Sequence, residues 1–190
     1  GRNGFGDLNM AQVEKGMKDA LNAKEGQPMD SAFVKQFKID PNQMNEIIIG
    51  YLQKRTAYEG ALNKEKGDKF RQEFYVKNSA DSTASGIVYL IQDSGSDVRA
   101  LSDRDTVKVN YRGTLIDGTE FDSSAKHGDK PVPMRADQGI DGWNEVIQLM
   151  PAGSEWEVYI PQELAYGPED RGTIKPFSAL IFKVEVVDVK

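Results

Sequence analysis

The chain has 190 residues, a hydrophobic content of 38% and a formal net charge of −6. It can hold one large domain or two small ones, and its negative charge argues against a nucleic-acid or anionic-membrane partner, because both attract a basic surface. It has no cysteine and one histidine, which excludes disulfides, thiolate chemistry and a multi-histidine metal site. The histidine, His127, lies in the polar stretch SAKHGDK, which favours a solvated surface imidazole.

The first part of the chain has helical periodicity. Apolar residues recur at helical spacing in residues 10–23 and again in residues 44–52. The second repeat follows Asp40–Pro41, a helix start in which the aspartate caps the first amides and proline fits the first position. No apolar run approaches the roughly 20 residues that a membrane span requires. We predict a helical domain over residues 1–50.

Residues 51–80 are mostly polar. Opposite charges stand four residues apart at Lys64 and Asp68, which favours a solvated helix of the kind that often bridges domains. We therefore predict a linker helix over these residues. The continuity of a helix from residue 41 to residue 77 is weakened by internal glycines, each of which costs on the order of 1 kcal/mol relative to alanine. These glycines are Gly50, Gly60 and Gly67.

After Gly86 the hydrophobic period changes from helical to two. Apolar residues alternate in four segments, Asp117–Gly118 signals a hairpin turn, and an amphipathic segment before Pro151 predicts a short helix. The strand segments are 87–91, 107–115, 155–160 and 180–186, and the helical segment is 142–150. We therefore predict an α+β domain over residues 81–190, in which a curved antiparallel β-sheet with one buried face wraps around a short helix.

Large aromatic side chains and one carboxylate are spread over the strands and loops of this domain. Taken singly, each has a structural explanation: Phe182 and Trp156 stand in alternating strands, which favours the core, and Asp122 in FDSS fits a turn or cap. Taken together, a pocket explains them better, because a core gives no reason for the acid beside an aromatic ring. The group comprises Tyr111, Phe121, Asp122, Trp143, Tyr166 and Phe182.

Ordered motifs carry a family resemblance. From about residue 86 to residue 190, the chain resembles the FKBP-type peptidyl-prolyl cis–trans isomerases. The matching pieces are VNYRGTLIDGTEFDSS, KPVPMRADQGIDGW, QLMPAGSEWEVYIPQELAYG and ALIFKVEVV. The helical N-terminal part resembles the dimerisation domain of the macrophage-infectivity-potentiator and periplasmic FKBP group. The resemblance implies an isomerase without cofactor or metal, which acts on proline-containing unfolded or nascent polypeptides during folding and has chaperone activity.

The resemblance also implies a proline-binding pocket between the sheet and the short helix. Trp143 matches its floor, Ile140 matches the residue whose backbone N–H binds a ligand carbonyl, and Trp156 stays in the core. The catalytic residues implied are Asp122, Tyr166 and Tyr111. The substrate-binding residues implied are Phe121, Met134, Ile140, Trp143, Ile174 and Phe182.

The lip of this pocket departs from the family pattern. Gly139 stands where a branched aliphatic residue is usual, and Met134 stands where a second aromatic residue is expected. The loop after Tyr166, GPEDRGTIKPF, is unusually charged and has Lys175 where proline is common. These departures leave a second hypothesis open, that of a proline-binding chaperone or adaptor module with little catalysis.

Partners and location are implied by the resemblance alone. It implies a homodimer through residues 1–50, a pocket that macrolide inhibitors can enter, and a place in the bacterial periplasm or cell envelope. Because the sequence begins with Gly1 and not with Met, we expect that a signal segment has been removed. Neither a nucleic-acid partner nor a transmembrane segment is expected.

Overall fold

The structure, a computed structural model, describes residues 44–100, 102–128 and 130–190. It divides into two units between Tyr58 and Glu59. Most of the predicted helical domain over residues 1–50 lies outside the described residues. No helix within the described ranges has both the length and the apolar character needed to cross a membrane.

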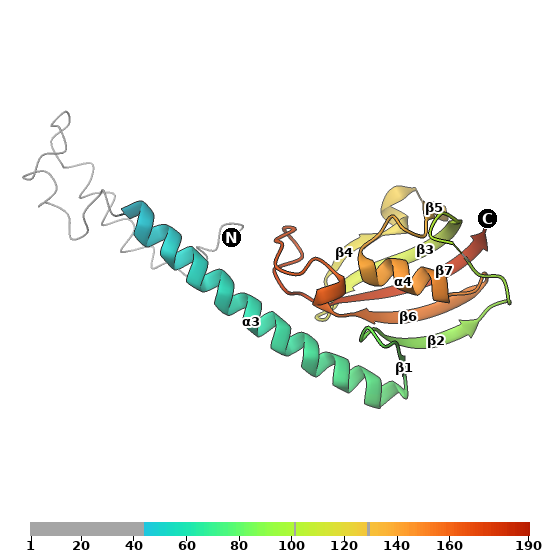
Figure 1. The fold of residues 1–190 in the computed structure, drawn as a ribbon, viewed down its shortest axis with the longest axis horizontal. Helices are drawn as coiled ribbons and strands as arrows, with labels where there is room; N and C mark the ends of the chain where they lie inside the picture. The colour runs from blue at the N-terminus through green and yellow to red at the C-terminus, as the bar shows by residue number, and fades with distance from the viewer. Residues whose placement is uncertain (1–43, 101, 129) are drawn as a thin grey trace, which may run out of the picture. The chain divides into compact units, whose positions relative to one another are not determined.

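The long helix α3 runs from Met44 to Asn78 and crosses from the first unit to the second (Figure 1). It is continuous through all three internal glycines, although each of them weakened the expectation of a continuous helix. The helix ends because Ser79 adopts a left-handed conformation with φ of 49°, and the Asn78 side-chain amide donates to the Phe74 carbonyl at 3.0 Å.

Seven strands form one antiparallel sheet in the second unit, in the order β1-β2-β6-β7-β3-β4, with β5 also paired to β3. The sheet and its short helix confirm the predicted α+β class. The strands are β1 Asp81–Ser82, β2 Val88–Ser94, β3 Thr106–Leu115, β4 Glu120–Ser123, β5 Val132–Arg135, β6 Ser154–Ile160 and β7 Leu180–Val189.

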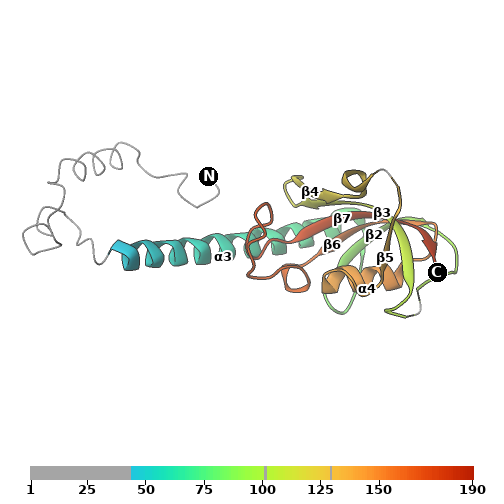
Figure 2. The ribbon, with the colours of Figure 1, turned by 90° about the horizontal axis from the view of Figure 1, so that it is seen from above.

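The main core lies between the sheet and α4, which spans Asp141–Leu149 (Figure 2). Helix α4 buries Trp143, Val146 and Ile147 against alternate residues of β6 and β7, such as Val158 and Val184. This arrangement follows from the pleat, because residues two apart on a strand face the same side. Trp156 also lies in this core, where its ring stacks on Tyr89 with a centroid separation of 4.6 Å.

A second apolar cluster lies on the opposite pleat of the same strands. Phe74 of α3 packs there with Tyr159 and Ile181, which alternate with the residues of the main core. The helix approaches closely at Gly67, whose carbonyl accepts a hydrogen bond from Tyr159 Oη at 3.0 Å. The expectation of one buried sheet face was therefore incomplete. The second half of α3 covers part of the other face and belongs to the same unit as the sheet.

We expect Tyr159→Phe to lower the free energy of unfolding by about 1 kcal/mol, because it removes a buried hydrogen bond and keeps the ring. The matched control is Tyr75→Phe, since Tyr75 is a tyrosine on α3 that is 47% exposed. Urea unfolding at neutral pH measures both variants. Equal stability of the two would show that the bond between Tyr159 and Gly67 contributes nothing to the attachment of the helix.

Candidate active site

A cavity of about 230 Å³ opens between the sheet and the N-terminal end of α4. Its wall comes from strands β3, β4, β5 and β7, from the loop before α4, from α4 itself and from the loop after β6. The lining residues are Tyr111, Phe121, Asp122, Met134, Gln138, Gly139, Ile140, Trp143, Tyr166 and Phe182.

The β3–β4 hairpin places the aromatic ring and the acid of one wall. Gly118 adopts φ of 86°, as a tight turn at Asp117–Gly118 requires, and Leu115 N donates to Thr119 O at 2.9 Å. Gly113 of β3 pairs with Asp122 of β4. A Cβ atom at residue 113 would lie 2.6 Å from the Phe121 ring and 2.9 Å from the Phe182 ring, so only glycine lets both rings cross this strand.

Aromatic rings meet edge to face along the floor and walls. Trp143 is 4% exposed, and its ring centroid lies 5.4 Å from Tyr111 and 5.1 Å from Phe182. Phe182 in turn lies 5.6 Å from Phe121 at an interplanar angle of 86°. Such pairs contribute about 0.5–1.5 kcal/mol each beyond the burial of area. Trp143 Nε1 has no hydrogen-bond partner among the described residues, so packing alone holds the indole.

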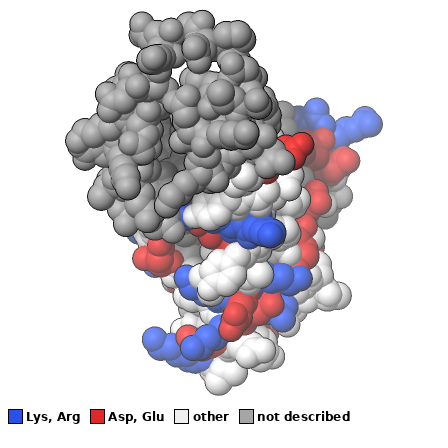
Figure 3. Space-filling view, turned by 90° about the vertical axis from the view of Figure 1, so that its left-hand side faces the viewer, with Lys and Arg blue, Asp and Glu red and all other residues white. Residues whose placement is uncertain are grey.

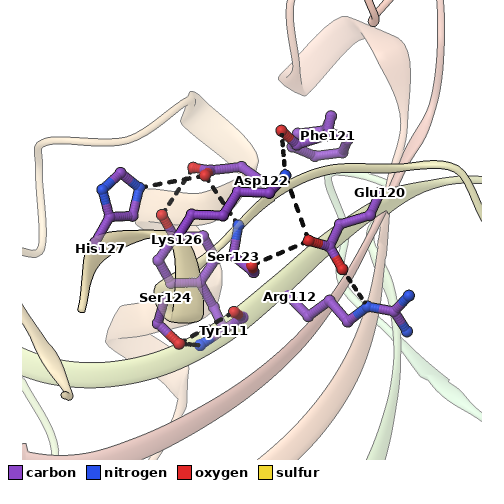
Figure 4. Close-up of polar contacts among 9 residues, drawn as sticks. All are labelled: Tyr111, Arg112, Glu120, Phe121, Asp122, Ser123, Ser124, Lys126 and His127. Atoms are coloured by element: carbon purple, nitrogen blue, oxygen red, sulfur yellow. Dashed lines mark hydrogen bonds and ion pairs between the residues drawn. The ribbon is translucent and has the colours of Figure 1, made fainter. Parts of the chain in front are cut away.

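The charged group among the residues that line the cavity is the Asp122 carboxylate, which three donors surround (Figure 4). Tyr111 Oη donates to Oδ2 at 2.8 Å, Ser123 N donates to Oδ1 at 2.9 Å, and His127 Nε2 lies 3.2 Å from Oδ1. Burial raises the pKa of Tyr111, and the hydrogen bond to Asp122 raises it further, so this phenol remains a neutral donor at physiological pH. The carboxylate therefore has a fixed orientation at the edge of an apolar cavity.

A separate set of charges secures the base of the β4 strand behind Asp122. The Glu120 carboxylate accepts from Arg112 Nε at 2.7 Å, from Ser123 Oγ at 3.0 Å and lies 3.3 Å from Lys126 Nζ. Arg112 first, then Ser123 and Lys126, lower the pKa of Glu120 to about 2. The strand that carries Asp122 is thus tied to its neighbour by an ion pair that persists at mildly acidic pH.

Eight of the nine residues predicted for the site line this cavity. The exception is Ile174, which is 5% exposed and packs into the main core below the loop. The sequence also favoured a solvated surface for His127. Its side chain is 53% exposed, yet its ring contacts Asp122, which the polar character of the stretch SAKHGDK did not indicate.

Gly139, which the sequence placed at the lip of the pocket, lines the cavity, and so does Gln138, which was not predicted for it. Gln138 stands two residues before Ile140, and this position was the signal that could have found it. Asn144 of α4 holds this segment, since its Oδ1 accepts from Gly139 N at 2.8 Å and its Nδ2 donates to Gly139 O at 3.2 Å. A Cβ atom at residue 139 would lie 2.4 Å from Trp143 Cδ1, so the glycine leaves room for the indole.

Family comparisons cover both parts of the chain. The model described as FKBP-type peptidyl-prolyl cis-trans isomerase matches residues 98–187. The model described as the domain amino terminal to FKBP-type peptidyl-prolyl isomerase matches residues 1–91. The outer membrane protein MIP of Legionella longbeachae is 38% identical over 192 residues, which cover 97% of this chain and 77% of that protein. The chain belongs to the family of FKBP-type peptidyl-prolyl cis–trans isomerases.

Other members of this FKBP-type family agree with that assignment. A probable FKBP-type isomerase of Haemophilus influenzae is 37% identical over 94% of this chain and 72% of its own length. The crystal structure of FkpA from Escherichia coli superposes with a TM-score of 0.79 at 34% identity, covering 96% of this chain and 83% of that one. The resemblance drawn from the motifs is confirmed, and the chain is a peptidyl-prolyl cis–trans isomerase of the FKBP type.

We expect a tetrapeptide containing Phe-Pro to change the fluorescence of Trp143 and not that of Trp156, because only Trp143 lines the cavity. The variants Trp143→Phe and Trp156→Phe each leave one of the two tryptophans of the chain. A fluorescence titration should show the peptide-dependent change in Trp156→Phe and its loss in Trp143→Phe. The reverse pattern would place the peptide outside this cavity.

Proposed function

We propose that the aromatic cavity binds the prolyl side of an X–Pro bond and accelerates its rotation in unfolded or nascent polypeptides. The observation that carries this proposal is the juxtaposition of an aromatic floor, made by Trp143, with the oriented carboxylate of Asp122 at the rim. A pyrrolidine ring is a small apolar object that suits the face of an indole. No residue that forms a covalent bond is required, because the reaction breaks none.

The chemistry explains why an apolar cavity helps. Rotation about a peptide bond has a barrier of about 18–20 kcal/mol, and for X–Pro bonds it takes tens of seconds or more unaided. The barrier arises from amide resonance, so the planar amide is more polarised than the twisted one. A cavity with apolar walls stabilises the planar form less than water does. Rate acceleration follows where the twisted form is bound better than the planar form.

The polar residues have distinct proposed roles. Tyr166 Oη and the Ile140 backbone N–H are donors for substrate carbonyls, and no described residue engages the Ile140 N–H. The Asp122 carboxylate faces the carbonyl carbon, which becomes more electrophilic as the amide twists. Tyr111, predicted as catalytic, acts through Asp122, since its phenol donates to that carboxylate. Phe121, Met134 and Phe182 complete the apolar wall, whereas Ile174 supports the loop from beneath.

The charge pattern of the face shown in Figure 3 fits an uncharged target. On the described surface in Figure 3, basic and acidic side chains are interspersed and do not gather by sign. Several of them pair with one another, as Lys175 does with Asp170 and Arg171 with Glu169. Recognition then depends on the proline ring and the backbone of the substrate, so many different unfolded chains can bind. We propose that macrolide inhibitors can enter the same cavity.

We expect Asp122→Ala and Tyr166→Phe each to lower kcat/KM by about tenfold, because each removes one polar group that acts on the twisted amide. NMR exchange or a protease-coupled assay on a Phe-Pro tetrapeptide measures the rate. The control is Asp188→Ala, whose carboxylate is 44% exposed and pairs with Lys108 outside the cavity. Full activity in both site variants would reject the assigned roles.

The altered lip, with Met134 and Gly139, favours one alternative, a proline-binding chaperone or adaptor with little catalysis. Methionine is softer and more adaptable than an aromatic ring, so it can admit varied neighbours of proline without fixing them for rotation. The same assay separates the two functions. A wild-type chain that binds the tetrapeptide but leaves its isomerisation rate unchanged would support the alternative.

We also propose a homodimer formed through residues 1–50, and a place in the bacterial periplasm or cell envelope. Similarity to the domain amino terminal to FKBP-type isomerases over residues 1–91 supports the dimer. The described end of this segment, at the start of α3, exposes the large apolar side chains of Ile47, Ile48 and Ile49. The location is supported by the relative from Legionella longbeachae, whose name describes an outer membrane protein.

Sedimentation equilibrium at micromolar concentration should give about twice the chain mass of 21.1 kDa. We expect Ile49→Asp to shift the equilibrium toward monomer, because it places a charge in the proposed apolar interface. Val76→Asp is the matched control, since Val76 is also an exposed apolar residue of α3 but lies in the second unit. A monomeric wild-type chain would refute the dimer.

A further inference from the structure

We propose that the second half of α3 positions the rim of the prolyl cavity through the loop that follows β6. This loop, residues 161–178, is called the rim loop below because it carries Tyr166. It includes the short helix η2, Gln162–Leu164, at its start. The inference rests on the proposed role of Tyr166 in the cavity, and it assigns positioning residues that do not touch the substrate.

The rim loop is closed at its neck by backbone hydrogen bonds beside Tyr166. Phe177 N donates to Gly167 O at 2.6 Å, and Gly167 N donates to Gln162 O at 3.0 Å. The tip is tied back in the same way, with Arg171 N donating to Ile174 O at 2.9 Å and the Arg171 guanidinium 5.1 Å from the Tyr166 ring centroid. The position of Phe177 therefore determines the position of Gly167, which is the residue next to Tyr166.

Helix α3 holds this neck from outside the cavity. The Asn63 side-chain amide donates to Pro176 O at 3.0 Å, and the Phe177 ring lies against Gly60, which is buried. Lys64 Nζ also lies 3.6 Å from the Glu163 carboxylate, although this pair is half exposed and contributes little. Residues 60, 63, 64 and 67 fall on one face of the helix, so a single surface contacts both the rim loop and the sheet.

The backbone conformation of Phe177 indicates that its contacts with α3 and Gly167 hold it in place. Phe177 has φ of 58°, a left-handed conformation that is uncommon for a bulky residue and costs on the order of 1 kcal/mol or more. Such a conformation persists only where its surroundings fix it. The surroundings are the Gly60 surface on one side and Gly167 O on the other.

Gly60 is required by the same contact. A Cβ atom at residue 60 would lie 2.5 Å from Phe177 Cδ2, closer than atoms can approach without movement. Glycine within a helix is otherwise unfavourable relative to alanine. The glycine thus indicates a packing requirement at this turn of α3, and Gly60, Asn63 and Phe177 form a path from the helix to the rim of the cavity.

The test compares three glycine-to-alanine changes on the same helix of the full chain. Gly60→Ala places a methyl group into the Phe177 ring, Gly67→Ala contacts Ala179 at 3.2 Å without touching the rim loop, and Gly50→Ala meets nothing within 4 Å. We expect only Gly60→Ala to accelerate hydrogen exchange at Phe177 N–H and to lower kcat/KM by about tenfold, since small displacements of active-site groups reduce rates strongly.

A second background shows whether the effect passes through the ring. Phe177→Gly removes the ring and tolerates the left-handed conformation. In that background Gly60→Ala should cause no further loss of kcat/KM, because the clash is gone. An equal loss in both backgrounds would overturn the proposal, as would Gly60→Ala behaving like Gly50→Ala in exchange and activity.

Asn63→Ala keeps the proposal testable if Gly60→Ala does not fold. It should also accelerate exchange at Phe177 N–H and lower kcat/KM, whereas Gln72→Ala, an exposed control on α3, should change neither. Unaltered exchange in Asn63→Ala would overturn the positioning role. Failure of the proposed function would give a different result. Tyr166→Phe would retain full activity, while hydrogen exchange at Phe177 N–H would still respond to substitution of Asn63 and Gly60. That result would reject the catalytic part of this inference and keep the structural part.

Discussion

The pleat of β7 is the constraint on which the rest of the structure depends. Two consecutive residues of this strand face opposite sides: Phe182 lines the prolyl cavity, and Ile181 packs in the cluster that holds α3. Strand β6 repeats the division with Val158 and Tyr159. Because alternation along a strand is obligatory, Tyr159 and Ile181 face away from the cavity, and with Val88 of the neighbouring strand they form an apolar row on the other face. The second half of α3 covers part of that row.

The cavity keeps an apolar floor and a polar rim in separate places. Its floor is made of aromatic rings held by edge-to-face packing, whereas its rim carries a carboxylate with a neutral phenol as donor. Burial keeps Tyr111 protonated, so the donor does not compete as a second negative charge. The Glu120 cluster lies behind this rim and anchors the strand.

Sequence patterns sufficed for strands β2, β3, β6 and β7 and for α4, because apolar residues repeat along each of them with the period of a strand or a helix. Strands β1, β4 and β5 were not predicted, because segments of two to four residues are too short to show a period. Sequence patterns also did not suffice where distant segments meet. Gly60 and Gly67 were expected to destabilise α3, because helix propensity describes an isolated helix. It takes no account of a neighbouring residue that packs where a larger side chain would be. Lys64 was expected to pair along the helix with Asp68 but lies near Glu163. Ile174 matched a pocket motif yet turns into the core, since its side-chain direction depends on the loop.

The outer strands of the sheet determine how easily another polypeptide can pair with its edges. An exposed strand edge is a template on which an unfolded chain can add itself and aggregate. Here β1 has 2 residues and β4 and β5 have 4 each, and where β2 extends past β1 it carries a bulge between Ile91 and Asp93. For the unfolded polypeptides proposed above as substrates, the cavity is a place for a proline ring, whereas the short edge strands give their backbones little to pair with.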